Sequence, residues 1–520
     1  MLSPVADDVT RTDGEVTRTG APARPTLSNG VAAVVVFVAA AAVLVLEILA
    51  LRLIAPYVGV TLQTNTAVIG AALLAIALGA WTGGRVADRT DDAGRLIGPV
   101  LLAGAALILL TLPVVRFTGE ATRSTGDAGA TLLLAMVAVV LPAALLSSIP
   151  PMVATLQLDD LRRTGTVVGR LSSLGTLGAI VATFATGFVL VAAFPTSAIL
   201  LGTGAVVALA GAVVLWQRRQ LTPGTGLAPG VVALLPVATL LVALAPNPCQ
   251  VETEYHCAKV TADPARAGGR LLELDTLRHS YVDLTDPLYL EFEYTRAIAA
   301  VTDAVRPPGR AMTALHIGGG GFTLPRYLAA ARPGTRSTVL EIDGGVVELG
   351  RRRLGVDRIP GLTVRVGDAR TGLDEQPTGA YDVVVGDAFG GIAVPWHLTT
   401  REVAEQVRRV LRPDGVYAVN VIDYQPDRFA RAELATLRAV FGHVVLVSAA
   451  GTASGVGGGN HVLVAGQAPL PLAAIAEGLR RRGDWIVSDE ARTAAYAGSA
   501  PVLTDDRAPV DQLITTYARR

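Results

Sequence analysis

The order of apolar and polar positions divides the chain into two unlike halves. Residues 31–246 are almost wholly Ala, Val, Leu, Ile and Gly, and their charges occur only in short clusters. An apolar helix of about 20 residues spans the hydrocarbon core of a bilayer. The pattern therefore predicts seven membrane-spanning helices, at residues 31–54, 65–84, 97–115, 129–152, 171–193, 197–216 and 229–246.

From residue 311 onward, short continuous apolar runs alternate with amphipathic segments. Such runs predict strands of a parallel sheet that helices cover on both faces. The last two apolar runs, 443–450 and 461–466, predict a hairpin, because the glycine-rich turn between them is too short for a crossover helix. The expected fold class is therefore α + α/β, with a transmembrane helical bundle followed by a Rossmann-like doubly wound sheet.

The same pattern gives the expected domain boundaries. The polar N-terminal stretch has no periodicity and predicts a disordered tail. A short β-rich lead-in joins the membrane helices to the main sheet, and a helical extension follows that sheet. The tail, bundle, lead-in, Rossmann-like domain and extension are expected at residues 1–29, 30–247, 248–310, 311–470 and 471–520.

The distribution of arginines sets the expected orientation in the membrane. Arginine clusters follow the second, fourth and sixth spans and also occur in the tail. The alternate loops contain only Arg116 and Arg123, with Arg52 at the end of a span. Because positive charge is enriched in cytoplasmic loops, the tail is predicted to be cytoplasmic. Seven spans then place the residues after 246 outside the cytoplasm.

The two cysteines of the chain lie in this predicted extracytoplasmic part. Cys249 and Cys257 occur in "NPCQVETEYHC", and this spacing in an oxidising compartment predicts a disulfide. The alternative is two unrelated thiols. No second pair of ligands completes a zinc site, so no metal is expected. The net charge is zero and no basic tract is present, which gives no indication of nucleic-acid binding.

A glycine-rich stretch, "ALHIGGGGFTLPRYL", connects the first predicted strand to a helix. Gly318, Gly319, Gly320 and Gly321 allow the backbone to approach a ligand, and the helix directs its positive end toward it. The dinucleotide fingerprint requires a third glycine where this chain has Thr323. Taken alone, this loop is a weak sign of nucleotide binding.

Three acids at the ends of successive strands strengthen the indication. Glu341 ends the second strand, where an acid binds ribose hydroxyls, and Asp387 ends the fourth. Asp368 ends the third strand, and together with the backbone N–H of Ala369 it suits an adenine amino group. Carboxyl ends of parallel strands share one edge of the sheet, so the three acids are expected to form one site. The alternative is that each acid is a helix N-cap.

Longer motifs make the second half similar to a known enzyme family. The segment 271–299, "LLELDTLRHSYVDLTDPLYLEFEYTRAIA", resembles the substrate-lid segment of the spermidine synthase family of aminopropyltransferases. These enzymes have a class I S-adenosylmethionine (SAM) fold. The stretches "DAFGGIAVPWHLTT" (387–400) and "LTDDRAPVDQL" (503–513) resemble membrane-fused members of that group.

The resemblance implies roles for individual residues. Tyr294 falls on the substrate-pocket tyrosine, and Asp387 falls on the catalytic aspartate that accepts a proton from the attacking amine or holds that amine. Glu341 and Asp368 fall on the ribose-binding and adenine-binding acids. The resemblance also implies decarboxylated SAM as co-substrate, a small-molecule amine as acceptor and a homodimer.

The chain departs from the family pattern at two positions. The family's glycine loop carries an aspartate that contacts the aminopropyl donor, and Gly321 stands there in this chain. A second aspartate soon after the catalytic one holds the far amine of putrescine, and this chain has Gly390 and Gly391 in that region. Two anions that recognise a polycation are therefore missing, while the acids for the adenosine part are present.

Three functions are therefore open. The first is a membrane-bound aminopropyltransferase, and the second is a methyltransferase that uses SAM itself. The third is a non-enzymatic binding or transport-linked membrane protein, for which "GAWTGGRVADR" (79–89) resembles a loop of major facilitator transporters. His279, His397 and Asp423 are further candidates for shaping the site.

Overall fold

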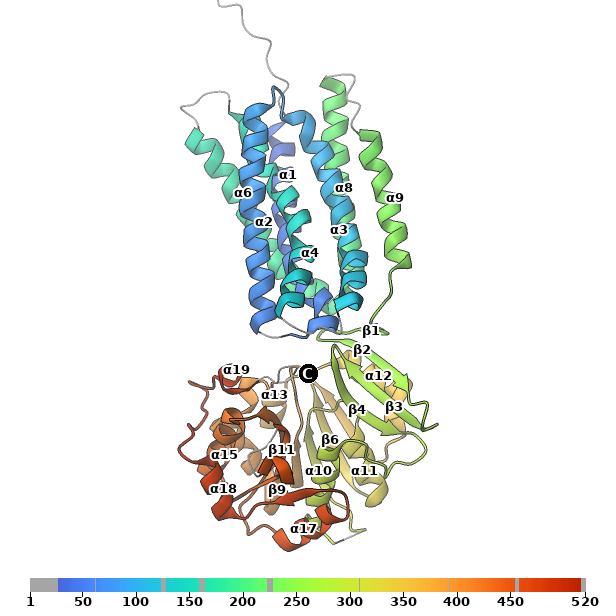
Figure 1. Cartoon of the computed structure of the whole chain (residues 1–520), viewed down its shortest axis with the longest axis vertical. Helices are drawn as coiled ribbons and strands as arrows, with labels where there is room; N and C mark the ends of the chain where they lie inside the picture. The colour runs from blue at the N-terminus through green and yellow to red at the C-terminus, as the bar shows by residue number, and fades with distance from the viewer. Residues whose placement is uncertain are drawn as a thin grey trace, which may run out of the picture.

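The computed structural model describes residues 27–60, 62–122, 128–158, 164–221, 228–307, 309–391, 393–453 and 458–515. The predicted disordered tail lies almost wholly outside these residues. Figure 1 shows a helical bundle, drawn in blue to green, next to an α/β domain drawn in green to red.

The bundle contains long helices and two interrupted ones. Its elements are α1 (Asn29–Val58), α2 (Leu62–Arg89), α3 (Gly94–Thr122), α4 (Ala128–Ser147), α5 (Ile149–Gln157), α6 (Thr164–Ala185), a π-helical turn (Thr186–Leu190), α7 (Val191–Ala193), α8 (Thr196–Leu221) and α9 (Ala228–Leu244). The helix is interrupted at Ser148, between α4 and α5, and prolines occupy the first turn of α5. A proline is tolerated there because the first N–H groups of a helix have no partner within it.

Six helical segments of the described chain are long and apolar enough to cross a membrane, judged by length and composition. They correspond to the first six predicted spans. The seventh predicted span coincides with α9, which has 17 residues and is therefore shorter than those six segments. A spanning role for α9 stays a prediction, as does the overall count of seven.

Small residues allow the bundle helices to approach closely. A Cβ atom at Gly79 of α2 would lie 2.2 Å from the carbonyl oxygen of Ala144 in α4. At Gly178 of α6, it would lie 2.4 Å from the carbonyl oxygen of Phe37 in α1. Only glycine fits at such contacts, which is the packing mode expected between membrane helices.

The α/β domain begins with a small antiparallel sheet and one helix. The strands are β1 (Val251–Glu252), β2 (Cys257–Ala262), β3 (Gly269–Leu274) and β4 (Leu277–Asp283), paired in chain order. Helix α10 (Glu293–Val305) follows. This segment is the predicted β-rich lead-in, and it also supplies a helix that packs on the main sheet.

The main sheet has the spatial order β12-β10-β11-β9-β8-β5-β6-β7. Its strands are β5 (Thr313–Ile317), β6 (Arg336–Glu341), β7 (Leu362–Val366), β8 (Tyr381–Gly386), β9 (Leu411–Tyr424), β10 (His443–Ala449), β11 (Gly458–Gly466) and β12 (Trp485–Val487). Strands β5 to β9 are parallel, whereas β11 is antiparallel to β9 and to β10. The predicted hairpin of the last two apolar runs is therefore confirmed.

Helices cover both faces of this sheet. They are α11 (Thr323–Ala331), α12 (Gly344–Leu354), α13 (Ala369–Asp374), α14 (Arg401–Val410), α15 (Arg428–Val440), α16 (Ala450–Ala453), α17 (Leu472–Arg480), α18 (Glu490–Ala497) and α19 (Val510–Leu513). Val383 and Val385 of β8 pack with α10, α11 and α17, while Val384 packs with α13, α14 and α15. Alternate side chains of a strand enter opposite cores, so an almost continuous apolar run is required.

The prediction of a helical C-terminal extension is only partly correct, because the extension also contains a strand. It contains α17, α18 and α19, but Trp485 to Val487 form β12, which pairs antiparallel with β10. This run has only three residues, which is too short for a periodicity signal. The pairing partner, not the local pattern, determines this strand.

Candidate active site

Asp387 is the first residue after β8 and lies where three elements meet. Its carboxylate accepts a hydrogen bond from the Tyr294 hydroxyl of α10 (3.1 Å) and one from the Asn420 amide of β9 (2.9 Å). Asn420 is fixed in turn by the amide of Asn460 on β11, at 3.0 Å. The predicted pair of Tyr294 and Asp387 is therefore in direct contact, and two strands hold the carboxylate in place.

The surroundings change the acidity of this pair. Burial raises the pKa of Asp387 to about 6, although the hydrogen bonds from Asn420 and Tyr294 act to lower it. Burial and the charge of Asp387 also raise the pKa of Tyr294 well above its ordinary value. Tyr294 therefore remains a hydrogen-bond donor, while Asp387 changes its charge near neutral pH.

The glycine loop is fastened to Glu341. One oxygen of Glu341 accepts the backbone N–H of Gly319 (2.7 Å) and of Gly320 (3.2 Å). Gly318 has φ +92°, and a Cβ atom there would lie 2.4 Å from the carbonyl oxygen of Asp387. This glycine is thus required both by its backbone conformation and by the close approach of the Asp387 loop.

Asp368 has two partners. One oxygen accepts the N–H of Arg370 at 2.7 Å, so Asp368 is the N-cap of α13, as the alternative interpretation held. Its other oxygen lies 3.3 Å from Nε2 of His397. His397 therefore reaches the site. Glu341 and Asp387 are not helix N-caps, and the cap of α12 is Asp343.

Two adjoining hollows contain the predicted residues. A narrow cavity is lined by Gly318, Gly320, Glu341, Asp368, Ala369, His397 and Asp387, among others. A larger cleft of about 650 Å³ lies next to it and is lined by Tyr294, Asp387, Asn420 and Asn460, among others. Asp387, His279 and Phe389 line both hollows. Gly319, Gly321 and Asp423 are predicted residues that line neither hollow.

Gly321, where the family carries an acid, has no room for a side chain. A Cβ atom at Gly321 would lie 2.7 Å from Cβ of Ser280 in β4. The Ser280 hydroxyl also accepts the backbone N–H of Gly321 at 2.9 Å. The small sheet therefore fills the place of the missing acid.

Sequence reasoning missed two acids of the cleft. Glu291 and Glu293, just before Tyr294, line the cleft together with Phe292 and Trp485. The Glu291 carboxylate accepts the Tyr289 hydroxyl at 2.5 Å, and that of Glu293 accepts the Trp485 indole N–H at 3.2 Å. The sequence did contain a signal for these acids, because Glu291 and Glu293 lie next to Tyr294, the predicted pocket tyrosine.

Other candidates have different outcomes. His279 lies at the junction of both hollows, and burial lowers its pKa to about 4, so its ring is neutral at physiological pH. The expectation that Asp423 helps to shape the site is wrong. Asp423 is buried and accepts the N–H groups of Phe429, Ala430 and Thr515, so its role is to fix the start of α15 and the C-terminal segment.

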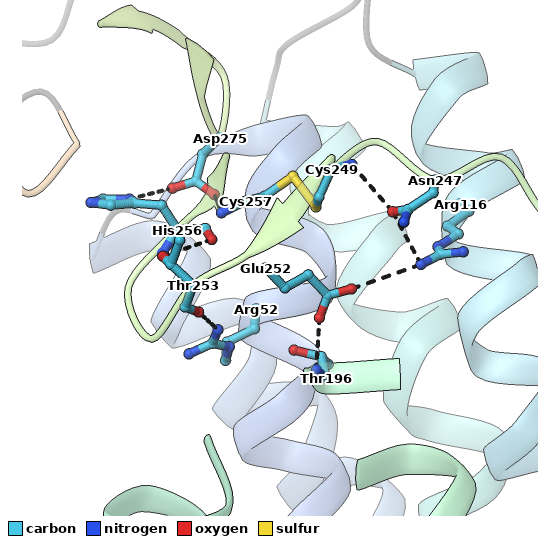
Figure 2. The surroundings of a disulfide bond; sticks show 10 residues. All are labelled: Arg52, Arg116, Thr196, Asn247, Cys249, Glu252, Thr253, His256, Cys257 and Asp275. Atoms are coloured by element: carbon cyan, nitrogen blue, oxygen red, sulfur yellow. Dashed lines mark hydrogen bonds and ion pairs between the residues drawn. A yellow bond between two sulfur atoms is a disulfide. The ribbon is translucent and has the colours of Figure 1, made fainter. Parts of the chain in front are cut away.

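A hairpin closed by a disulfide connects the site to the helical bundle. Cys249 and Cys257 are bonded, with their Cα atoms 5.1 Å apart, which confirms the predicted pairing. Figure 2 shows Arg52 and Arg116 of the bundle directed toward this hairpin. His256 in the hairpin lines the narrow cavity. Among the described residues, no group of His, Cys, Asp and Glu is suited to hold a metal ion.

Two curated proteins with similar sequences are both polyamine aminopropyltransferases. No family model matches the chain. A polyamine aminopropyltransferase of Vibrio vulnificus is 34% identical over 133 residues, which are 25% of this chain and 43% of that protein. The second relative, polyamine aminopropyltransferase 2 of Streptomyces coelicolor, is 29% identical over 448 residues, covering 80% of this chain and 78% of that protein. The chain is therefore similar to polyamine aminopropyltransferases.

The solved structures that resemble this chain include spermidine synthases. A probable spermidine synthase from Corynebacterium glutamicum has a TM-score of 0.46 and 29% identity, covering 52% of this chain and 98% of that protein. The spermidine synthase of Thermotoga maritima has a TM-score of 0.34 and 18% identity, covering 48% and 85%. The match to the Vibrio relative spans less than half of that protein. The five parallel strands with helices on both faces agree with the doubly wound sheet expected from the sequence.

The raised pKa of Asp387 predicts how its replacement changes stability. The folded protein holds this proton more tightly than the unfolded chain, so stability is highest below about pH 4 and falls as the pH rises through about 6. Asp387→Asn removes this loss. We expect the variant to be more stable than the wild type at pH 8, on the order of 1–3 kcal/mol, and to match it near pH 4.

Thermal unfolding of the purified full-length protein between pH 4 and pH 8 measures this difference. Asp506→Asn, at an exposed aspartate, is a matched control. A constant difference between Asp387→Asn and the wild type across this range would contradict the assignment.

Proposed function

We propose that this chain is a membrane-bound aminopropyltransferase that transfers an aminopropyl group from decarboxylated SAM to an amine. The supporting observation is the position of Asp387, which lies at the junction of the narrow cavity and the larger cleft. A group that acts on the attacking amine has to lie between a donor site and an acceptor site. The polyamine aminopropyltransferase relatives support the same reaction class.

The narrow cavity is the proposed donor site. Oε2 of Glu341 accepts the N–H groups of Gly319 and Gly320, whereas Oε1 accepts only that of Asp343 and retains a lone pair for a ribose hydroxyl. Asp368 and Ala369 also line this cavity, and the Asp368 carboxylate with the backbone N–H of Ala369 suits the adenine amino group. These residues are the proposed cofactor-binding set, together with the loop from Gly318 to Gly321.

The larger cleft is the proposed acceptor site. The family's second aspartate is absent at Gly390 and Gly391, but Glu291 and Glu293 supply two carboxylates from another element. Phe292 and Trp485 add aromatic faces, which favour the methylene chain and the cation of an aliphatic amine. A diamine or polyamine therefore has anionic partners at both ends, with Asp387 at the reacting end.

The proposed reaction is a displacement at carbon. The lone pair of the acceptor amine attacks the methylene carbon next to the sulfonium, the new C–N bond forms, and the C–S bond breaks. The products are methylthioadenosine and the aminopropylated amine. The proton released from the amine passes to Asp387, which is mainly ionised above about pH 6. Tyr294 fixes the orientation of this carboxylate through its hydrogen bond.

One observation favours a methyltransferase as a second candidate. The place of the loop acid is filled by Ser280, so the donor's free amine loses its expected partner. SAM carries a carboxylate beside its amine, and a loop without an acid does not repel it. The third function, ligand binding without turnover, would require that neither donor reacts.

We also propose that the helical bundle spans a membrane, with the α/β domain outside the cytoplasm. The composition of six helices supports the first part, and the arginine distribution and the disulfide support the second. The homodimer implied by the family resemblance stays a prediction.

The first test is a product assay with the full-length protein in detergent. The protein is incubated with putrescine and with either decarboxylated SAM or SAM, and products are identified by mass spectrometry. We expect spermidine and methylthioadenosine from decarboxylated SAM, with a rate that rises with pH through about 6. Asp387→Asn should lower the rate roughly 100-fold or more. Methylated products from SAM alone would replace the proposal by the second candidate.

The acceptor site predicts a selective effect on the amine. Glu291→Gln removes a charge from the cleft and leaves the donor cavity unchanged. We expect the KM for the amine to rise roughly 10-fold, because a charged hydrogen bond contributes about 1.5–3 kcal/mol and this one is partly exposed to solvent. The KM for the donor should stay the same. Steady-state kinetics with Glu477→Gln on α17 as control measure both values, and an equal rise in the donor KM would contradict the assignment.

The proposed orientation predicts how the two cysteines react in intact cells. A membrane-impermeant maleimide should label the wild type only after treatment with a membrane-impermeant reductant, because both thiols are bonded. Cys249→Ser frees Cys257 and should be labelled without reductant. Labelling of this variant only after cell lysis would place the domain in the cytoplasm.

A further inference from the structure

Two arginines of the bundle hold the disulfide-closed hairpin, at different points. Arg52 of α1 donates to the backbone carbonyl oxygens of Thr253 and Glu254 at the hairpin turn. Arg116 of α3 contacts the side chains of Asn247 (3.3 Å) and Glu252 (3.9 Å) near its base. Figure 2 shows both guanidinium groups approaching the hairpin from the bundle.

The turn held by Arg52 is also part of the α/β domain. The Thr253 hydroxyl donates to Oδ2 of Asp343 at 2.5 Å, and both residues are buried. Oδ1 of Asp343 caps α12 by accepting the N–H groups of Gly345 and Val346. A Cβ atom at Gly345 would lie 2.7 Å from Cγ2 of Thr253, so the turn is packed closely on the start of α12.

The same contacts continue to the glycine loop. The backbone N–H of Asp343 donates to Oε1 of Glu341 at 3.0 Å. Oε2 of Glu341 accepts the N–H groups of Gly319 and Gly320. An unbroken series of hydrogen bonds and one peptide segment therefore leads from a helix of the bundle to the loop of the donor cavity.

We propose that Arg52 is a positioning residue for the donor site, acting through Thr253, Asp343 and Glu341 on the glycine loop. This inference rests on the proposed function of the narrow cavity as a nucleoside site. Arg52 fixes two carbonyl oxygens of the turn, and Thr253 then presents its hydroxyl to Asp343. A carboxylate that caps a helix and receives a buried hydroxyl has one favoured position, and Glu341 depends on it.

A second observation supports a specific role for Arg52, as distinct from general docking of the bundle onto the domain. The Arg116 partners, Asn247 and Glu252, lead to Cys249 and to Thr196 of α8, both at the bundle end of the hairpin. Arg52 in contrast holds the turn that contacts Asp343. The two arginines have the same charge and both bind the hairpin, so they form a matched pair for a test.

The test measures binding of methylthioadenosine to the full-length protein in lipid nanodiscs by calorimetry. Arg52→Gln should raise the Kd roughly 3- to 30-fold, the range expected for coupling through a contact network. Arg116→Gln should leave the Kd unchanged. The KM for the amine acceptor should also stay unchanged in Arg52→Gln, because Glu291 and Glu293 of the acceptor cleft take no part in these contacts. Arg52→Lys, which keeps the cation, should recover part of the affinity.

A double-mutant cycle tests the route. Thr253→Val removes the hydroxyl and keeps the carbonyl oxygen that Arg52 binds. If the effect passes through Thr253, the double variant of Arg52→Gln with Thr253→Val should bind no more weakly than the weaker single variant. If the fold-changes in Kd of the two single variants multiply in the double variant, the proposed route is overturned. An equal loss of affinity in Arg116→Gln would overturn it as well.

A measurement without ligand separates this inference from the proposed function. Hydrogen exchange of the peptide that contains Gly319 and Gly320 should be faster in Arg52→Gln than in the wild type and in Arg116→Gln. Faster exchange in a protein that does not bind methylthioadenosine would support the structural route and overturn the nucleoside site. Unchanged exchange and unchanged Kd, in a variant with wild-type gel-filtration behaviour, would overturn the inference itself.

Discussion

Five parallel strands end at one edge of the sheet, and the rest of the site depends on this constraint. Strands β7, β6, β5, β8 and β9 are neighbours in that order and run in the same direction. Residues that follow these strands therefore meet, although they are far apart in the sequence. Glu341, Asp368 and Asp387 come together for this reason, and the loop between β5 and α11 closes the space between them.

The same edge lies next to the helical bundle, which changes how the site is built. A Cβ atom at Gly391, just beyond Asp387, would lie 3.5 Å from the carbonyl oxygen of Val60 between α1 and α2. The bundle thus contacts the region where the resembling family carries its second aspartate. The larger cleft has Glu291 and Glu293, just before and at the start of α10, as further carboxylates. Ser280 likewise fills the room of the loop acid. The two acids that are absent at Gly321 and near Gly391 would therefore lie where Ser280 and the bundle pack against the site.

Much of the fold follows from the sequence because its signals are local. Strands such as 313–317 are continuous apolar runs buried on both faces, and the helices between them have clear amphipathic periods. The positions of Glu341, Asp368 and Asp387 were predictable for the same reason, since each lies at or just after the end of a strand. The candidate roles of Tyr294 and Asp387 came from motif resemblance, whereas the hydrogen bond of 3.1 Å between them depends on the fold.

What the sequence did not reveal depends on contacts between distant segments. Asn420 and Asn460 lie on neighbouring antiparallel strands, and only that pairing turns two ordinary amides into supports for Asp387. Asp423 looked equally suitable three residues along β9, but its carboxylate is used by the start of α15. The link from Arg52 to Glu341 crosses more than 280 positions through Thr253, which no local pattern contains.

The location of the domain and its chemistry constrain each other. A disulfide persists in an oxidising compartment, whereas a sulfonium donor carries a permanent charge and does not cross a bilayer unaided. An extracytoplasmic aminopropyltransferase therefore needs a supply of donor at its own side of the membrane, and a cytoplasmic one does not. Binding without turnover has no such requirement. The orientation of the bundle consequently determines whether the proposed enzyme requires a supply of donor outside the cytoplasm.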